Sequence, residues 1–260
     1  MASGYGLKGH AAIVTGSTSG IGQQLAQALA AEGVNVVLNG FGDAAKIEQD
    51  RAALAKSSGV TVLYHPADMT KPAEIADMVG LAHRELGRLD ILVNGAAGNF
   101  ICLAENLSPN GFGTVVDIDL KGTFNVSKAA LPHLKTRGGS VLNISATLPY
   151  LGTMGQSHAA AAKAGIDSLT RVLACEWGPH KIRVNGIAPG PVEGTEGVRR
   201  LMSDQSRAGL HEECPLGRMA TIDEIANAAL YLSSDAASFV TGVTLVVDGG
   251  LWLRSARILG

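Results

Sequence analysis

The first residues able to do chemistry form a glycine-rich loop near the N-terminus. It runs Thr15-Gly16-Ser17-Thr18-Ser19-Gly20-Ile21-Gly22, with the spacing G-x-x-x-G-x-G. The loop follows a short apolar run, His10–Thr15, and precedes apolar residues at helical spacing, Gly22–Glu32. Glycines between a strand and a helix let the backbone approach a pyrophosphate, whose charge the helix N-terminus favours. The loop is therefore a candidate dinucleotide site, and ordinary turn glycines are the alternative.

The rest of the chain predicts the elements that would hold this loop. Apolar runs predict further strands at Asn35–Leu38, Thr61–Tyr64, Leu89–Asn94, Val141–Ile144, Arg183–Ile187 and Val243–Val247. Amphipathic stretches predict helices at Ala44–Ser58, Pro72–Leu86, Asn110–Leu134, Ser157–Trp177 and Ile222–Leu232. Strands that alternate with helices require parallel crossovers, and hence one sheet covered on both faces. We predict an α/β fold: a single Rossmann domain over residues 1–260 with a doubly wound, parallel, seven-stranded sheet.

Composition narrows the class of protein. The 260 residues are 46% hydrophobic and 17% charged, with a formal net charge of −2, which argues against a nucleic-acid surface. No apolar run reaches transmembrane length and no N-terminal signal pattern is present. Three dispersed cysteines fit a reducing compartment, and the ending Arg257-Ile258-Leu259-Gly260 is not a Ser-Lys-Leu signal. We expect a cytoplasmic protein without a metal site, because no His, Asp or Glu cluster has ligand spacing.

Several motifs in order resemble the short-chain dehydrogenase/reductase family over nearly the whole chain. They are the glycine loop, Asp68 after the third strand, Asn94-Gly95-Ala96-Ala97-Gly98 after the fourth and Pro189-Gly190-Pro191 after the sixth. The resemblance implies that Asp68 contacts the adenine, that the Asn94 segment lies along the cofactor and that the Pro189 turn contacts the nicotinamide. An ordinary turn aspartate is the alternative for Asp68. The candidate cofactor-binding residues are Gly16, Ser17, Thr18, Ser19, Gly20, Ile21, Gly22, Phe41, Asp68, Met69, Asn94, Gly95, Ala96, Lys163, Pro189, Gly190 and Val192.

The segment after the second strand bears on the choice between NAD(H) and NADP(H). It runs Asn39-Gly40-Phe41-Gly42-Asp43 and holds no cation for a 2′-phosphate. Ser19 stands where the family often has a basic residue. Both absences slightly favour NAD(H), although Lys46 could reach inward.

The catalytic residues depart from the family pattern, which is an Asn, Ser, Tyr and Lys tetrad. Lys163 occupies the lysine place, but the tyrosine place four residues earlier is Ala159. The serine place is Ala146 and the asparagine place is Asp119. A lysine beside a tyrosine lowers the pKa of the phenol, which then serves as acid or base. That mechanism does not carry over to a chain with alanine at the tyrosine place.

These departures have a resemblance of their own. Ala97-Gly98-Asn99-Phe100, Asp119, Asn143-Ile144-Ser145-Ala146-Thr147-Leu148, His158 with Lys163, and Gly194-Thr195-Glu196-Gly197 are similar to the peroxisomal-type 2,4-dienoyl-CoA reductases. The resemblance implies hydride delivery to the δ-carbon of a dienoyl thioester and protonation at the α-carbon. It implies that Asp119 holds a proton-donating water and that Lys163 binds the nicotinamide ribose. A purely structural ion pair of Asp119 with Lys163 or Lys121 is the alternative.

The N-terminal third resembles a different subfamily. Leu38-Asn39-Gly40-Phe41-Gly42-Asp43-Ala44-Ala45 is similar to bacterial 3-hydroxybutyrate dehydrogenases, which use NAD. A natural lineage with mixed traits and a recombined chain both explain this. The leading hypothesis is reduction of an unsaturated acyl thioester. The alternatives are a 3-hydroxyacyl or alcohol dehydrogenase with a relocated acid, such as His158, Tyr150 or Ser145, and a non-catalytic dinucleotide-binding protein.

Two further segments suggest partners. Arg199-Arg200, after the sixth strand, are candidates for binding the phosphates of CoA, and a solvated helix face is the alternative. The run Phe239–Leu253 is largely apolar, and the family resemblance implies that it packs against a neighbouring subunit. We therefore expect an acyl-CoA substrate and a homotetramer.

Overall fold

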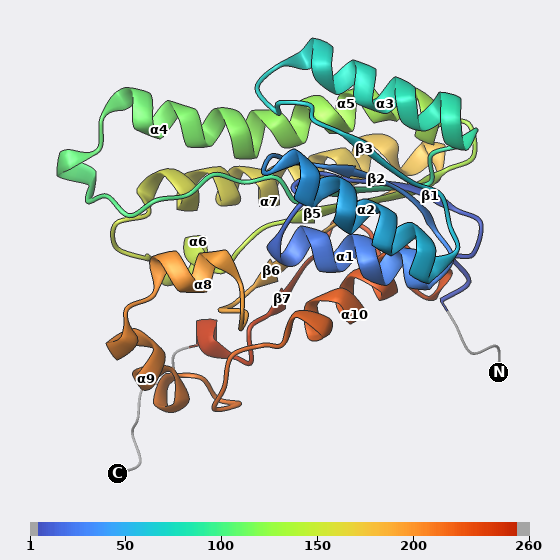
Figure 1. Ribbon diagram of the computed structural model, residues 1–260. Helices are drawn as coiled ribbons and strands as arrows, with labels where there is room; N and C mark the ends of the chain where they lie inside the picture. Colours follow the sequence, from blue (N-terminus) through green and yellow to red (C-terminus); the bar gives the residue numbers. More distant parts are fainter. Residues whose placement is uncertain (1–4, 254–260) are drawn as a thin grey trace.

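The computed structural model describes residues 5–253, and within them seven strands form one parallel sheet (Figure 1). The order across the sheet is β3-β2-β1-β4-β5-β6-β7. The strands are β1 (Ala11–Val14), β2 (Asn35–Asn39), β3 (Val62–His65), β4 (Ile91–Asn94), β5 (Gly139–Ile144), β6 (Ile182–Pro189) and β7 (Thr244–Val247). The predicted α/β fold with a doubly wound seven-stranded sheet is confirmed. The ending Arg257–Gly260 lies outside the described residues.

Helices cover both faces of this sheet. They are α1 (Gly20–Ala31), α2 (Ala44–Ser58), α3 (Pro72–Leu86), α4 (Pro109–Val116), α5 (Gly122–Leu134), α6 (Leu148–Leu151), α7 (Ser157–Trp177), α8 (Glu196–Leu201), α9 (Asp204–Glu213) and α10 (Ile222–Ser233). Short 3₁₀ turns lie at Ala104–Asn106, Gly178–His180, Asp235–Ala237 and Leu251–Leu253.

The core has two halves because each strand buries alternate side chains on opposite faces. In β1, Ala12 and Val14 pack with residues of α1 and α10, whereas Ile13 packs with residues of α3, α5 and α7. Burial on both faces explains why the strands are continuous apolar runs. Helices of the two groups lie on opposite sides of the sheet in Figure 1.

The strand order reverses beside β1, which pairs with β2 on one side and β4 on the other. In an open parallel sheet, the crevice outside the carboxyl ends of the strands at such a reversal is where ligands bind. The glycine loop leaves β1 at this point, and the segments after β2, β4, β5 and β6 leave the same edge.

One predicted helix is interrupted. The stretch expected as a continuous helix over 110–134 consists of α4 and α5 joined by a π-helical segment, Asp117–Lys121. Hydrogen bonds from residue i to i+5 widen this turn, and such turns often occur at functional sites. The helices α6, α8 and α9 were not predicted, since they are short or lack a regular apolar face.

Candidate active site

The glycine loop is locked to the segment after β4. The hydroxyl of Thr15 accepts hydrogen bonds from the backbone N–H groups of Gly95 (3.0 Å) and Ala96 (3.2 Å). Gly16 has a φ of +68°, and a Cβ there would lie 2.8 Å from the backbone of Ala96. Only glycine meets both constraints at this position.

The start of α1 fits a pyrophosphate. A Cβ on Gly22 would lie 2.2 Å from the carbonyl oxygen of Gly16, so the helix packs directly on the loop. A Cβ on Gly20 would meet nothing within 4 Å, which leaves bare backbone at the N-terminus of a 12-residue helix. Helix N-termini of this kind bind anions. Residues 16–22 therefore fit the cradle of a dinucleotide.

Not every loop side chain faces that cradle. Ser17 is buried, and its hydroxyl donates to the carbonyl of Val14 (2.7 Å) and accepts from the N–H of Asn39 (2.9 Å). The hydroxyl of Thr18 donates to the carbonyl of Phe41 (2.9 Å). These two side chains hold the loop to β1 and to the end of β2, so they support the cradle from behind.

The end of β2 carries no side chain directed at a ribose. The amide of Asn39 donates to the carbonyls of His65 (3.0 Å) and Ala67 (2.9 Å), and its oxygen accepts from Gly16 N–H (3.4 Å). Phe41, two residues later, is 66% exposed. The exposed ring of Phe41 and the backbone of this segment are what the end of β2 presents to solvent.

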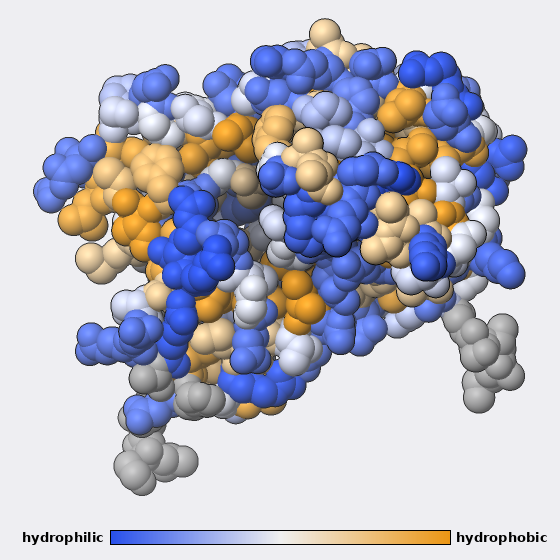
Figure 2. All heavy atoms as spheres, in the orientation of Figure 1, coloured by the Kyte–Doolittle hydropathy of each residue, from blue (hydrophilic) through white to orange (hydrophobic). Residues whose placement is uncertain are grey.

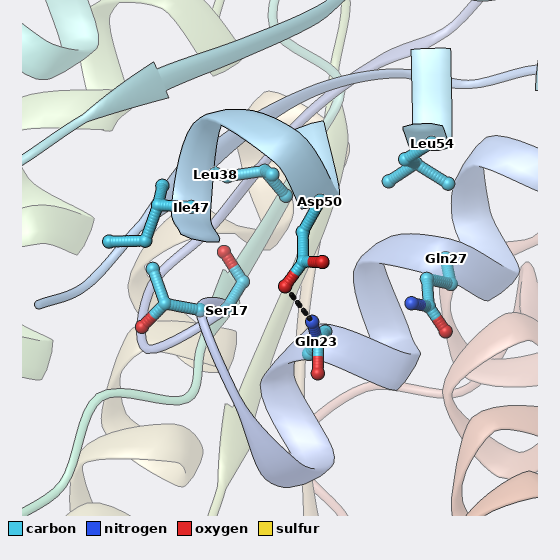
Figure 3. A pocket seen from close by; sticks show the side chains of 8 residues that line it. Ser17, Gln23, Gln27, Leu38, Ile47, Asp50 and Leu54 are labelled. Carbon is cyan, nitrogen blue, oxygen red and sulfur yellow. Dashed lines mark hydrogen bonds between the residues drawn. The ribbon is translucent and has the colours of Figure 1, made fainter. Parts of the chain in front are cut away.

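A pocket opens behind the loop, between α1 and α2 (Figure 3). It is lined by Ser17, Thr18, Gln23, Gln27, Leu38, Ile47, Asp50 and Leu54. Gln23 donates to Asp50 across it (3.4 Å), and Asp50 also forms an ion pair with Lys46 (2.5 Å). The ionic group that lines the pocket is a carboxylate, and the nearby lysine is already paired with it.

Asp68 lies after β3 in a tight turn. Its carboxylate accepts from the N–H and the hydroxyl of Thr70, both at 2.8 Å, and these bonds lower the pKa of Asp68. The neighbouring side chain of Met69 is buried in the core. An adenine could therefore contact Asp68 and the backbone of Met69.

Asn94 ends β4 with its side chain in a buried polar network. Its amide donates to the hydroxyl of Ser127 (2.9 Å) and to Asn143 (2.8 Å), which donates in turn to Thr170 (2.9 Å). This network joins β4, α5, β5 and α7 beneath the crevice. The backbone from Asn94 to Ala96 leaves β4 at the carboxyl edge of the sheet, against the glycine loop.

At the centre of the site, Asp119 and Lys163 form a buried pair. Lys163 Nζ lies 3.2 Å from Asp119 Oδ2 and donates to the carbonyl of Ile144 (3.0 Å). Asp119 Oδ1 accepts from the N–H of Gly98 (2.7 Å). Oδ2 has no hydrogen bond of good geometry among the described residues, so this buried oxygen can hold a water or a substrate proton.

The π-helical segment turns Asp119 inward. Asp119 is 1% exposed, whereas Asp117 in the same segment forms a surface ion pair with Lys121 (2.5 Å). The carbonyl of Asp119 accepts from the hydroxyl of Thr123 (2.6 Å). Of the two sequence-based partners for Asp119, the structure places Lys163 against it and pairs Lys121 elsewhere.

Tyr150, the phenol that could replace the missing tyrosine, is bonded elsewhere. Ala159 is buried one helical turn before Lys163. Tyr150 donates its O–H to Asp167 (2.5 Å), and burial together with that carboxylate raises the pKa of Tyr150. The hydroxyl of Ser145 donates to the backbone carbonyl of Lys163 (3.5 Å). Two of the three candidates for a relocated acid are therefore bonded to the protein, and the third, His158, is fully buried.

The turn after β6 closes the other side of the crevice. Gly190 N–H donates to the carbonyl of Val247 (3.0 Å), and a Cβ on Gly190 would lie 2.6 Å from the Cβ of Asp248. Val192 is buried and bridges to Ala220. Pro189, the last residue of β6, holds this turn at the carboxyl edge of the sheet.

The site opens beside exposed apolar side chains. Figure 2 shows them gathered on the left, over α4 and the segment before it, next to a hollow in the surface. Large apolar side chains that are at least 36% exposed in this region are Phe100, Ile101, Leu103, Phe112 and Met154. Ile101 packs against Gly155, whose carbonyl accepts from Cys102 N–H (2.9 Å), so these residues lie beside the start of α7.

Arg199 and Arg200 lie on the exposed helix α8. Arg199 forms an ion pair with Glu196, and Arg200 lies 4.0 Å from the same carboxylate. Within residues 5–253, no group of three or more His, Cys, Asp or Glu side chains is placed to hold a metal ion. None of the helices described here is both long and apolar enough to cross a membrane.

The chain is similar to known proteins over most of its length. A family model described as enoyl-(acyl carrier protein) reductase matches residues 16–252. The peroxisomal 2,4-dienoyl-CoA reductase [(3E)-enoyl-CoA-producing] of Arabidopsis thaliana is 43% identical over 97% of this chain and 88% of its own length. The D-beta-hydroxybutyrate dehydrogenase of Rhizobium meliloti is 38% identical over 92% and 97%. The two resemblances seen in the sequence are thus confirmed.

A solved structure extends the likeness to the fold. A short-chain type dehydrogenase/reductase from Mycobacterium ulcerans superposes with a TM-score of 0.90 at 31% identity, covering 96% of this chain and 92% of that one. The glycine cradle, the strand order and these relatives lead to one assignment. The chain belongs to the short-chain dehydrogenase/reductase family of NAD(P)-dependent oxidoreductases.

Proposed function

We propose that this enzyme reduces a 2,4-dienoyl thioester of coenzyme A. The observation that carries the proposal is the buried Asp119–Lys163 pair, with alanine at the tyrosine and serine places. Reduction of a ketone needs an acid to protonate an alkoxide, and the phenol that does this in the family is missing. Reduction of a conjugated thioester needs only charge stabilisation at the carbonyl oxygen and a proton at carbon.

Lys163 and Asp119 have different roles in the proposed reaction. When bound, the nicotinamide supplies a hydride to the δ-carbon. Lys163 has three N–H donors, of which the Ile144 carbonyl and Asp119 take two directions, leaving one for the nicotinamide ribose. Asp119 Oδ2 holds the water that protonates the α-carbon, and the hydroxide left behind takes a proton from solvent. Protonation of the α-carbon leaves a 3-enoyl product, and the Arabidopsis relative carries that product in its name.

The surroundings of the site support an acyl substrate. The apolar side chains Phe100, Ile101, Leu103, Phe112 and Met154 offer an acyl chain a non-polar surface beside the reaction centre. A small hydroxy acid has no long apolar chain that would pack on that surface. We propose that Arg199 and Arg200 bind the CoA phosphates, exchanging their present ion pairs with Glu196 for the ligand.

We propose that residues 1–260 act as one domain and that the cofactor is held by the seventeen residues named above. NAD(H) is slightly favoured over NADP(H), because Asn39 is bonded inward and Lys46 is paired with Asp50. In the adjoining pocket, a 2′-phosphate would thus lie near the carboxylate of Asp50, and the nearby lysine, Lys46, is already paired with that carboxylate. We also propose a homotetramer and, from the sequence, a cytoplasmic location.

The experiment that tests the function compares two substrates with two cofactors. Oxidation of NADH and NADPH is followed with trans-2,trans-4-hexadienoyl-CoA and with acetoacetate. The proposal expects turnover of the dienoyl thioester at least 100-fold above that of acetoacetate. Preferred turnover of acetoacetate would instead support a 3-hydroxyacyl dehydrogenase, the activity class of the Rhizobium relative.

A further inference from the structure

His158 is a buried polar side chain whose hydrogen bonding the fold does not explain. It lies in the first turn of α7 and is 0% exposed. Neither Nδ1 nor Nε2 has a hydrogen-bond partner within residues 5–253. Buried polar atoms in folded proteins nearly always have a hydrogen-bond partner. The two unpaired nitrogens of this imidazole therefore indicate that a ligand or a water binds there.

The neighbours of His158 tie it to the reaction centre. Three successive residues after β4 make three successive contacts: Gly98 N–H donates to Asp119 (2.7 Å), Asn99 donates to Gln156 (2.8 Å), and Phe100 packs edge-to-face on His158 at 4.3 Å. One short segment therefore connects the Asp119–Lys163 pair to the start of α7. His158 and Asp119 contact opposite ends of it.

The same segment holds a second unpaired polar atom. Among the described residues, Asn99 Oδ1 is buried without a hydrogen-bond donor, whereas Asp119 Oδ2 has Lys163 Nζ as its ion-pair partner at 3.2 Å. His158 stands beside Ala159, where the sequence has lost the tyrosine, and Asn99 bonds to Gln156 just before it; the serine is lost at Ala146. Those two lost side chains are the ones that would hydrogen-bond a substrate carbonyl.

We infer that an imidazole N–H of His158 donates a hydrogen bond to the thioester carbonyl oxygen and so replaces the missing tyrosine and serine as the oxyanion donor. This inference rests on the proposed function. Reduction at the δ-carbon moves an electron pair along the diene to the carbonyl oxygen, where the N–H stabilises the negative charge. Protonation of the α-carbon returns the pair, and the imidazole keeps its proton throughout. His158 is thus a donor and not the acid that an alcohol dehydrogenase would require.

A spectroscopic measurement tests this donor apart from turnover. Hexadienoyl-CoA is bound in the presence of oxidised cofactor, and its ultraviolet absorption is recorded. A hydrogen bond to the carbonyl polarises the conjugated chain and moves the absorption to longer wavelength. We expect this red shift in the parent protein and in His158→Gln, whose amide can still donate, and its loss in His158→Phe.

Turnover is measured on the same proteins. Removal of an oxyanion donor lowers kcat by about 10²–10³-fold, which we expect for His158→Phe, with less than about a tenfold loss for His158→Gln. His133→Gln is the matched control, since His133 packs on His83 at the far ends of α5 and α3. The control should keep both the shift and kcat.

The possible outcomes distinguish a failure of the role proposed for His158 from a failure of the proposed function. An active parent protein whose red shift and kcat survive in His158→Phe would overturn the role of His158 and leave the proposed function standing. A parent protein that binds but does not reduce the dienoyl thioester would overturn both. A variant that loses the shift while reduced cofactor still binds as tightly as in the parent would support the inference.

Discussion

At the scale of single residues, Gly16 allows the two loops of the candidate cofactor site to pack against each other. Its left-handed backbone and its contact with Ala96 hold the loop after β1 against the loop after β4. The glycine spacing in the sequence was enough to predict this loop. That Ser17 faces inward could not be predicted, because its orientation depends on hydrogen bonds to Val14 and Asn39, which lie on two different strands.

Replacement of Gly16 by alanine should lower both stability and cofactor affinity. Strain at positive φ and the 2.8 Å contact with Ala96 together cost about 1–3 kcal/mol. Gly59→Ala is the matched control, because Gly59 has φ +71° but open space around a Cβ. Thermal unfolding should register both substitutions. Fluorescence titration with the cofactor should register Gly16→Ala alone, and equal affinity for the two variants would contradict this role of the loop.

Tyr150→Phe tests whether this tyrosine serves as a relocated acid. Its O–H is held by Asp167, and burial raises its pKa further from neutral pH. We therefore expect kcat to stay within about threefold of the parent value, with the same pH profile between pH 6 and 9. A 100-fold loss of kcat would show that Tyr150 takes part in proton transfer.

At the scale of elements, the central departure from expectation is the π-helical segment Asp117–Lys121. The residues from Asn110 to Leu134 have a helical apolar pattern, and nothing in that pattern marks a turn with one extra residue. The sequence therefore identified Asp119 through family resemblance, and only the structure shows why it faces inward beside Lys163. The sequence named His158 as a candidate relocated acid and Asn99 as part of a motif, but their contacts could not be predicted, because these come from packing of the segment after β4.

The N-terminus of α10 should weaken in acid. Glu224 forms a capping box with Thr221, and its pKa falls to about 2, chiefly through its hydrogen bond with Arg218. A carboxylate with a lowered folded-state pKa stabilises the protein above its unfolded pKa, roughly 4.3, and loses this effect as the pH falls towards 2. Glu224→Gln should thus lower Tm at pH 7, and the difference from the parent should shrink between pH 4.5 and pH 2. A difference in Tm that does not depend on pH would contradict this account.

At the scale of the whole molecule, the parallel seven-stranded sheet and its two covered faces followed from the alternation of apolar runs and amphipathic stretches, whereas the order of the strands comes from the structure. The assembly could be expected only from the family resemblance. In the part of the chain described, edge strand β7 exposes Leu245, and Phe239 and Trp252 nearby are also exposed. Exposed apolar side chains near an unpaired strand edge are typical of a subunit interface.

Leu245→Glu should weaken the proposed tetramer. A carboxylate buried at an interface without a partner costs several kcal/mol, which is enough to shift the assembly at micromolar concentration. Light scattering should give a tetramer mass for the parent protein and a smaller mass for the variant, while circular dichroism stays unchanged. A parent protein that is already monomeric at micromolar concentration would contradict the proposed assembly.

The proposed reduction of a dienoyl thioester depends most on Asp119 as the residue that holds the protonating water. The decisive measurement is kcat for trans-2,trans-4-hexadienoyl-CoA in the parent, Asp119→Ala and Asp117→Ala. Asp117 lies in the same π-helical segment but pairs with Lys121 at the surface, so its variant controls for disturbance of the segment. We predict a loss of 10²-fold or more in Asp119→Ala and near-parent turnover in Asp117→Ala. Equal turnover in all three proteins would show that the buried pair is structural and that the proton comes from elsewhere.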